Sequence, residues 1–273
     1  MGYDLHTHST YSDGALQPRE LIRKAVESGL KGIALTDHDT VSGLDEAFEE
    51  AEKYRFTFIP GIELTTDYGD VEVHLLGYNL DYRNEALLRK LKAVLESRAE
   101  RARLIVSRLN KAGIPLLWEN VKAETNSDFI GRSHIYRALE TLGVTAGYGR
   151  DAFNYFLGKN GVAYVPHREI GTFEALDLIL KTDGIPVLAH PGRMTDERLI
   201  RKLVDHGLRG IEVYYPTHTP QLIKRYLQLA AAYQLIVTGG SDYHGVFGDK
   251  NLGDAQVGNV FDWYKPKIST KNL

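Results

Sequence analysis

The residues that could do chemistry in this chain begin with two histidines, His6 and His8, which directly follow a strand-like stretch. In an extended segment residues i and i+2 face the same side, so both imidazoles can bind a single metal ion. Asp13 follows in a Ser-Asp-Gly turn and adds a carboxylate. This spacing favours metal binding near the first strand.

The same residue types recur where later apolar runs end. They lie in Thr36-Asp37-His38-Asp39, Gly61-Ile62-Glu63, Glu72-Val73-His74, Ala189-His190-Pro191-Gly192 and Ser241-Asp242-Tyr243-His244-Gly245. Parallel α/β folds place their active sites at the carboxyl ends of the strands, so these side chains should converge. Each motif alone is a weak signal, but together they predict a metal centre built from imidazoles and carboxylates.

Other histidines do not share this pattern. His206 ends an expected helix, and His167 and His218 lie in loops next to prolines, so we expect all three to be solvated or structural. The chain has no cysteine, which excludes a thiolate metal site and a disulfide framework. Any metal must therefore be held by His, Asp, Glu or water, a set that suits Mn²⁺, Fe²⁺ or Zn²⁺.

The elements that must position these residues are short apolar runs alternating with helix-period segments. This alternation predicts an α/β fold with a largely parallel sheet. The expected strands are Tyr3–His6, Gly32–Thr36, Phe56–Ile62, Val71–Tyr78, Ile185–Ala189, Gly210–Tyr214 and Leu235–Thr238. The expected helices include one from Pro18 to Gly29, one that follows Ser42 as N-cap, and Phe173–Lys181, Asp196–His206 and Pro220–Tyr233.

The alternation breaks between about residues 84 and 166, where leucines recur at helical spacing with Arg and Lys between them. Further helix-like pieces lie at Ser133–Leu142 and Asp151–Leu157. A barrel-like domain interrupted by a helical insertion fits this pattern better than two sequential domains. We therefore expect residues 1–83 and 167–273 to form one barrel and residues 84–166 to form the insertion.

Composition limits the partners that this chain can have. Its 273 residues carry a formal net charge of −3, which argues against a protein that coats long nucleic acid. No apolar run approaches the roughly 18 residues of a membrane span, and the strand-like start leaves no room for a signal peptide. We expect a cytoplasmic protein with no membrane contact and no obligate protein partner.

The motifs around the histidines resemble those of a known family. Asp4-Leu5-His6-Thr7-His8-Ser9, the motifs ending at Asp39 and Glu63, Ala189-His190-Pro191-Gly192 and Gly240–Gly245 look like the successive motifs of PHP (polymerase and histidinol phosphatase) phosphoesterases. The chain is most similar to the stand-alone PHP enzymes that act on nucleoside 3′,5′-bisphosphates and on 5′ ends of short RNA. Gly131-Arg132-Ser133-His134 and Tyr164-Val165-Pro166 match two elements of that subgroup.

The resemblance implies a distorted (β/α)7 barrel that binds two to three divalent ions, with Mn²⁺ expected and Fe²⁺ or Zn²⁺ as alternatives. It places the first ion between His6, His8, Glu63 and Asp242, and the second between Asp13, His38 and His244. Glu63 would bridge to a third ion held with His74 and His190. Asp37 would orient a metal-binding histidine without touching the metal itself, because ligating imidazoles donate their other N–H to a carboxylate or carbonyl.

The resemblance also implies the reaction. A hydroxide activated by the metals would hydrolyse a phosphomonoester of a small nucleotide, most simply the 3′-phosphate of a bisphosphate, and the enzyme would also shorten oligonucleotides from the 5′ end. Arg132 offers a guanidinium fork for a terminal phosphate, and His134, Lys159 and Arg193 are further candidates for substrate contact. Histidinol phosphatase is the rival activity, and a non-catalytic PHP module that supports a polymerase is the alternative from another class.

Overall fold

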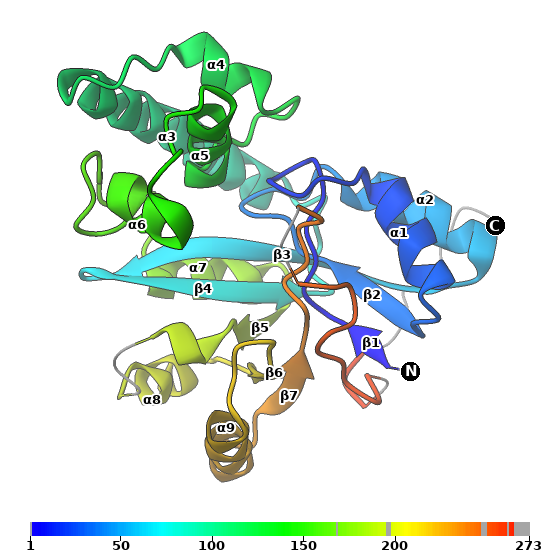
Figure 1. Ribbon diagram of the computed structural model, residues 1–273. Helices are drawn as coiled ribbons and strands as arrows, with labels where there is room; N and C mark the ends of the chain where they lie inside the picture. Colours follow the sequence, from blue (N-terminus) through cyan, green and yellow to red (C-terminus); the bar gives the residue numbers. More distant parts are fainter. Residues whose placement is uncertain (1, 168, 195–197, 247–249, 261, 265–273) are drawn as a thin grey trace.

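The computed structural model describes residues 2–167, 169–194, 198–246, 250–260 and 262–264, in which strands and helices alternate for most of the chain (Figure 1). The strands are β1 (Tyr3–Asp4), β2 (Gly32–Leu35), β3 (Thr57–Tyr68), β4 (Val71–Tyr78), β5 (Ile185–Leu188), β6 (Gly210–Tyr214) and β7 (Ile236–Gly239). The helices are α1 (Pro18–Glu27), α2 (Leu44–Tyr54), α3 (Glu85–Lys111), α4 (Trp118–Ala123), α5 (Arg132–Thr141), α6 (Ala152–Leu157), α7 (Thr172–Lys181), α8 (Arg198–Asp205) and α9 (Pro220–Tyr233). Two 3-10 turns, η1 (Gly149–Asp151) and η2 (Pro191–Arg193), complete the described elements. No helix in these ranges is both long and apolar enough to cross a membrane.

The described strands form one sheet in the order of the sequence, from β1 to β7. Neighbouring strands are parallel except on the two sides of β4, which runs antiparallel to both β3 and β5. The sheet curls so that its two edge strands meet. The amide of Leu5, just after β1, donates to the carbonyl of Gly239 in β7 at 3.1 Å. This confirms the expected distorted (β/α)7 barrel.

The reversed strand follows from the turn between β3 and β4. Only Gly69 and Asp70 join the two strands, and such a connection can make only an antiparallel hairpin. Gly69 has φ of +62°, a left-handed conformation that glycine adopts without strain. Because the hairpin pairs over its full length, β3 extends to Tyr68, beyond the expected end at Ile62.

Helix ends mostly follow the chemistry read from the sequence. Pro18 opens α1, and Thr219 caps α9 through its hydroxyl, which accepts from the amide of Leu222 at 3.3 Å. The expectation that Ser42 caps the second helix was wrong: Gly43 is the N-cap of α2, and the Ser42 amide instead donates to the Thr40 hydroxyl. The expected helix from Asp196 begins at Arg198 in the described residues, since 195–197 lie outside them.

The helices α3 to α6 follow β4 and precede α7, and they gather on the side of the strands away from α8 and α9 (Figure 1). Apolar side chains from Ala102 to Val165 pack into a cluster of their own, distinct from the clusters that line the strands. We propose that residues 84–166 form an insertion with its own core. Arg98 of α3 ties it to the barrel, with NH1 placed 2.9 Å from the buried carboxylate of Asp39.

Candidate metal centre

The predicted metal ligands come from six different strands or from the segments that directly follow them. His6 and His8 follow β1, His38 follows β2, Glu63 lies in β3 and His74 in β4. His190 follows β5, Asp242 and His244 follow β7, and Asp13 lies in the loop before α1. The curled sheet brings these distant sequence positions to one end of the barrel, as parallel folds require.

A first group consists of His6, His8, Glu63 and Asp242, all buried, with one candidate ligand atom from each within 4.8 Å of the others. Glu63 Oε2 lies 3.1 Å from His6 Nε2 and 3.3 Å from His8 Nε2. Asp242 Oδ1 lies 3.1 Å from the same atom of His8 and 3.5 Å from that of His6. Two imidazoles and two carboxylates therefore surround one point.

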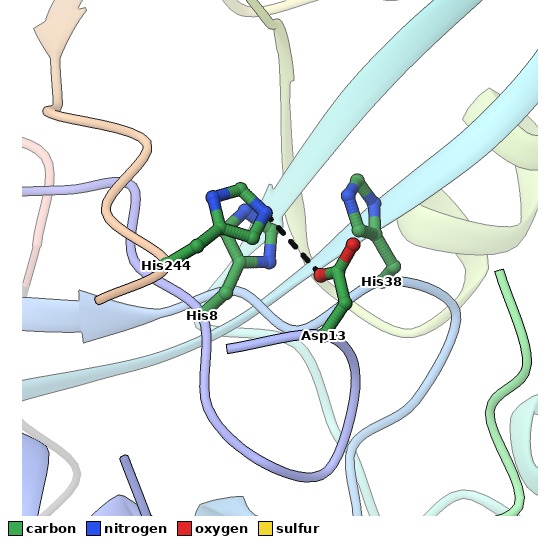
Figure 2. A group of neighbouring side chains, drawn as sticks. All are labelled: His8, Asp13, His38 and His244. Atoms are coloured by element: carbon green, nitrogen blue, oxygen red, sulfur yellow. Dashed lines mark ion pairs between the residues drawn. The ribbon is translucent and has the colours of Figure 1, made fainter. Parts of the chain in front are cut away.

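A second group consists of His8, Asp13, His38 and His244, whose rings and carboxylate face one another in Figure 2. His244 Nε2 lies 3.2 Å from Asp13 Oδ1, the ion pair drawn as a dashed line. The His8 ring stacks on His244 at 4.2 Å and on His38 at 4.5 Å between ring centroids. His8 joins this group in addition to the three residues that the family resemblance implied.

A third group forms on the other oxygen of Glu63. Glu63 Oε1 lies 2.7 Å from His74 Nδ1 and 3.0 Å from His190 Nε2, whereas Oε2 faces the first group and also lies 3.1 Å from His38 Nδ1. His38, Glu63 and His74 again place one ligand atom each within 4.8 Å. The two oxygens of one buried carboxylate thus point at different sets of imidazoles, which is the geometry of a bridging ligand.

The donor atoms are better placed to bind metal ions than to form hydrogen bonds with one another. His6 Nε2, His8 Nδ1, Asp13 Oδ1 and Glu63 Oε2 are buried and make no hydrogen bond to the described residues, although some of them approach each other to about 3 Å. Native proteins rarely leave such atoms unpaired. One candidate ligand atom of each of these residues lies within 4.8 Å of those of its group, and oxygen and imidazole donors suit Mn²⁺, Fe²⁺ or Zn²⁺.

Electrostatics lead to the same conclusion. Although burial opposes ionisation, the imidazoles around Glu63 hold the pKa of its carboxyl well below the usual range, and the same holds for Asp242. Burial lowers the pKa of His190 to about 4, so this ring is neutral and able to ligate. At His74 Glu63 outweighs burial and raises the pKa to about 9. The carboxylates remain charged at neutral pH and favour cations between them.

Glu212 in β6 holds two ligands in place, and sequence reasoning missed it. Its side chain is fully buried; Oε1 accepts from His6 Nδ1 at 3.0 Å, and Oε2 accepts from the backbone amide of His190 at 2.7 Å. The first bond places a ring proton on His6 Nδ1, so Nε2 is the nitrogen that can bind a metal ion. An acid within the apolar run Gly210–Tyr214 was the available signal, because a buried glutamate needs partners.

Asp242 is held by a second set of donors. Its Oδ2 accepts from Tyr215 Oη and from Lys250 Nζ, each at 2.7 Å, while Oδ1 faces the first ligand group. The residue has φ of +54°, an uncommon conformation for a non-glycine residue, which is maintained by its surroundings. Neither Tyr215 nor Lys250 was among the residues expected from the sequence.

Asp37, expected to orient a ligand, instead organises the loop that carries Asp13. It is buried, and it accepts from the amide of Ser9 at 2.7 Å and from the hydroxyls of Ser9 and Ser12 at 2.6 and 2.5 Å. Burial raises the pKa of the Asp37 carboxyl above its usual value. The structure thus shows Asp37 bracing the chain between His8 and Asp13 rather than hydrogen-bonded to an imidazole.

The ligand groups open into a cavity of about 580 Å³. Its lining includes Asp13, His38, Glu63, His74, His190, Asp242 and His244, together with Arg137, Arg193 and Lys250. Arg193 NH2 lies 3.5 Å from Asp242 Oδ2, so this predicted substrate contact does reach the metal groups. Arg137 was not expected; it donates to the carbonyl of Asp13, and its buried Nε has no hydrogen-bond partner among the described residues.

The other predicted substrate contacts lie differently. One terminal nitrogen of Arg132, Nη2, donates to both carboxylate oxygens of Glu72, at 2.8 and 2.9 Å. This contact lies beside a smaller cavity of about 120 Å³ that also reaches His38 and His74. His134 is buried and its Nδ1 accepts from the Gly131 amide, which caps α5; it lines neither cavity. Lys159 donates to the carbonyl of Asp70 and also lines neither.

The remaining histidines are structural in different ways. His218 is buried, with Nδ1 2.9 Å from the Val213 carbonyl and Nε2 accepting from the Gly192 amide. His206 pairs with Asp177 on the surface. His167 is buried between Asp67 and Glu169, with one ring nitrogen 2.9 Å from each carboxylate. Arg98 and Arg101 lie beside this trio and already balance its charge.

Comparison with known proteins agrees with this geometry. The family model described as PHP domain matches residues 4–139. The chain is 35% identical to the 5′-3′ exoribonuclease Rnm of Salmonella typhimurium, over 98% of this chain and 95% of that protein. It is 34% identical to the 3′,5′-nucleoside bisphosphate phosphatase of Chromobacterium violaceum, over 95% of this chain and 91% of the relative.

A solved structure described as that of a metal-dependent phosphoesterase, from Bifidobacterium adolescentis, superposes with a TM-score of 0.86 at 32% identity. The match covers 95% of this chain and 93% of that one. Sequence and structure therefore agree over nearly the full length of the chain. The chain belongs to the PHP family and is a metal-dependent phosphoesterase.

Proposed function

We propose that this enzyme hydrolyses the 3′-phosphate of nucleoside 3′,5′-bisphosphates and also releases nucleotides from the 5′ end of short oligonucleotides. Two relatives that match nearly the whole chain carry these activities in their names. Neither histidinol phosphatase nor a non-catalytic polymerase module has comparable support from the relatives described above.

The observation that carries this proposal is the charge around the larger cavity. Arg137, Arg193 and Lys250 line it in addition to the metal-ligand groups. A single phosphoryl group bound at the metals needs few further cations, whereas a ligand with two phosphates carries about four negative charges near neutral pH. A volume of about 580 Å³ also suits a nucleotide-sized ligand.

We assign two to three divalent ions to the centre, with Mn²⁺ as the expected ion and Fe²⁺ or Zn²⁺ as alternatives. His6, His8, Glu63 and Asp242 would hold one; Asp13, His38 and His244 with His8 a second; Glu63, His74 and His190 a third. Divalent ions bound there would lower the pKa of a water and neutralise phosphoryl oxygens. Hydrogen bonds within the chain would orient these ligands: Glu212 contacts His6, and Tyr215 and Lys250 contact Asp242.

The cationic side chains bind and orient the substrate. Arg193 is half-exposed, and among the described residues its ion pair is to one carboxylate oxygen, at 3.5 Å, so it keeps donors that a ligand in the cavity can use. Arg132, by contrast, already makes its two-oxygen contact with Glu72. A phosphate would have to displace that carboxylate, so we propose that Arg193 contributes more to substrate binding than Arg132 does.

Steady-state kinetics with Mn²⁺ on adenosine 3′,5′-bisphosphate, AMP and histidinol phosphate test the proposal. A second charge-assisted contact is worth roughly 1.5–3 kcal/mol, so kcat/KM for the bisphosphate should exceed that for AMP by about tenfold or more. Histidinol phosphate has one phosphate and a cationic amine, and it should be the poorest substrate. Faster turnover of histidinol phosphate than of the bisphosphate would overturn the assignment.

Substitutions separate the two arginines. Arg193→Met should lower kcat/KM for the bisphosphate by about tenfold or more, and Arg132→Met should lower it less. Arg201→Met is a matched control, since Arg201 pairs with Asp205 on the surface of α8. A larger loss from Arg132→Met than from Arg193→Met would show that the phosphate does displace Glu72. Release of nucleotides from a 5′-phosphorylated trinucleotide tests the exonuclease activity separately.

A further inference from the structure

Part of the wall of the larger cavity comes from the insertion rather than from the barrel. Tyr136, Arg137 and Glu140 of α5 and Phe153 of α6 line it together with the metal-ligand groups. The two helices lie next to each other in Figure 1, in the group that stands apart from α8 and α9. The insertion therefore adds two aromatic rings to a cavity whose other lining residues are mostly ionisable, with Ser133 and Val246 beside them.

The two rings form a pair that is open on the cavity side. Tyr136 and Phe153 have ring centroids 5.4 Å apart at an interplanar angle of 61°, an edge-to-face arrangement. Both side chains are only half-buried. A phenylalanine gains nothing from contact with water in a polar cavity, so a partly open ring there marks a surface that an apolar or aromatic ligand group can cover.

Neighbouring polar groups hold the pair and limit what can bind. Tyr136 lies near Glu140, one turn further along α5, and burial and this carboxylate raise the pKa of its hydroxyl. The guanidinium of Arg132 lies over the Phe153 ring at 5.9 Å, and Arg137 is next to Tyr136 in the sequence. A ligand that covers the rings must therefore also be compatible with cations, which favours a flat aromatic group joined to an anion.

We propose that Tyr136 and Phe153 form a subsite that stacks the nucleobase of the substrate while the metal groups hold its phosphate. This inference rests on the proposed nucleotide substrate. It gives a binding position to the nucleobase, the part of that substrate that the metal groups do not hold. Base–aromatic stacking needs only a π-face, so the subsite should accept purines and pyrimidines alike. It explains why a cavity lined for phosphate should also contain two open aromatic rings.

Equilibrium binding tests the subsite with two ligands that lack a 3′-phosphate, the group that the proposed reaction removes. Titration calorimetry on Mn²⁺-loaded protein compares AMP with ribose 5-phosphate, which has the same sugar and phosphate but no base. Wild type should bind AMP about tenfold or more tighter. Phe153→Leu and Tyr136→Leu, which keep apolar bulk but remove the π-face, should lose most of this preference and leave ribose 5-phosphate binding unchanged. Phe153→Trp, which keeps a π-face, should retain the preference for AMP.

Tyr155→Leu is the matched control, because Tyr155 is an exposed aromatic on the same helix that does not line the cavity. It should bind both ligands as wild type does. Unchanged preference for AMP in both the Phe153 and the Tyr136 variants would overturn the subsite, as would a wild type that binds the two ligands equally. If AMP preference behaves as expected but the bisphosphate is not hydrolysed, the subsite stands and the proposed reaction fails.

Discussion

Glu212 provides the sharpest test of how the chain prepares its metal ligands. Both of its oxygens are committed: one accepts from His6 Nδ1 at 3.0 Å and the other accepts from the His190 amide at 2.7 Å. The side chain is fully buried, so no water can replace either donor. Glu212→Gln keeps the shape of the side chain but turns one acceptor into an NH2 donor.

The size of the effect follows from these two contacts. If the glutamine NH2 faces the His190 amide, two buried donors face each other and one hydrogen bond is lost, at a cost of roughly 1–3 kcal/mol. If the NH2 faces His6, the ring proton moves to Nε2, the atom that points into the first ligand group. Loss of such an orienting partner typically weakens metal affinity by about 10- to 100-fold.

Competition between the protein and a fluorescent chelator for Mn²⁺ measures this affinity directly. Glu50→Gln is the control: Glu50 is also buried and accepts from Arg23 and Lys53, but it lies in α2 outside the centre. That variant should lose some stability and keep its Mn²⁺ affinity. If folded Glu212→Gln binds Mn²⁺ as tightly as wild type, the proposed role of Glu212 is wrong.

Two further predictions concern the centre and its support. Glu63→Gln should lose more bound metal than Asp13→Asn, because Glu63 belongs to two of the three ligand groups and Asp13 to one; equal metal content of the two variants by elemental analysis would contradict a bridging role. At His167, hydrogen bonds to Asp67 and Glu169 outweigh burial and raise the pKa above its usual 6.5. The free energy of unfolding that protonated His167 contributes is therefore fully present below about pH 6.5. It is lost as pH rises through the raised pKa of His167. Denaturant unfolding should show the difference in free energy of unfolding between wild type and His167→Gln to be larger near pH 6 than near pH 9; a difference that grows towards pH 9 would refute a protonated His167.

Much of the fold was readable because its signals are local. Alternating apolar runs and helix-period segments predicted the strands, the helices and the barrel. Gly69-Asp70 is a dipeptide typical of hairpin turns, but the expected end of the third strand at Ile62 lay too far from it for a hairpin to be recognised. The exact ends of β3 could not be read, since they depend on pairing with β4 across the hairpin.

At the centre, residue type and position were enough to select side chains that the fold then brings together. His-x-His after a strand and acids at strand ends are signals that exist within a few residues. Their roles as ligands remain predictions, although the structure places them in shared groups. Lys250 and Tyr215 could not be identified this way, because their importance comes from contact with Asp242 and not from any local motif.

Arg132 shows that a residue selected from its local sequence can already be engaged by a distant segment. Its sequence context predicts an available guanidinium at the start of a helix, but β4 places Glu72 directly against it, 60 residues earlier in the chain. Tyr136 and Phe153 likewise read as ordinary residues of amphipathic helices. Only the packing of α5 against α6 turns them into a pair facing the cavity. Contacts between distant segments decide which side chains are free to bind substrate.

The most direct test of the account is an anomalous-scattering map from crystals of the protein loaded with Mn²⁺. We predict two to three peaks within one cluster, spaced by roughly 3.5–4 Å, one of them among His6, His8, Glu63 and Asp242 and a second among Asp13, His38 and His244. The Glu63 carboxylate should lie beside more than one peak. A single peak at full Mn²⁺ loading, or peaks away from Glu63, would contradict a multinuclear phosphoesterase centre.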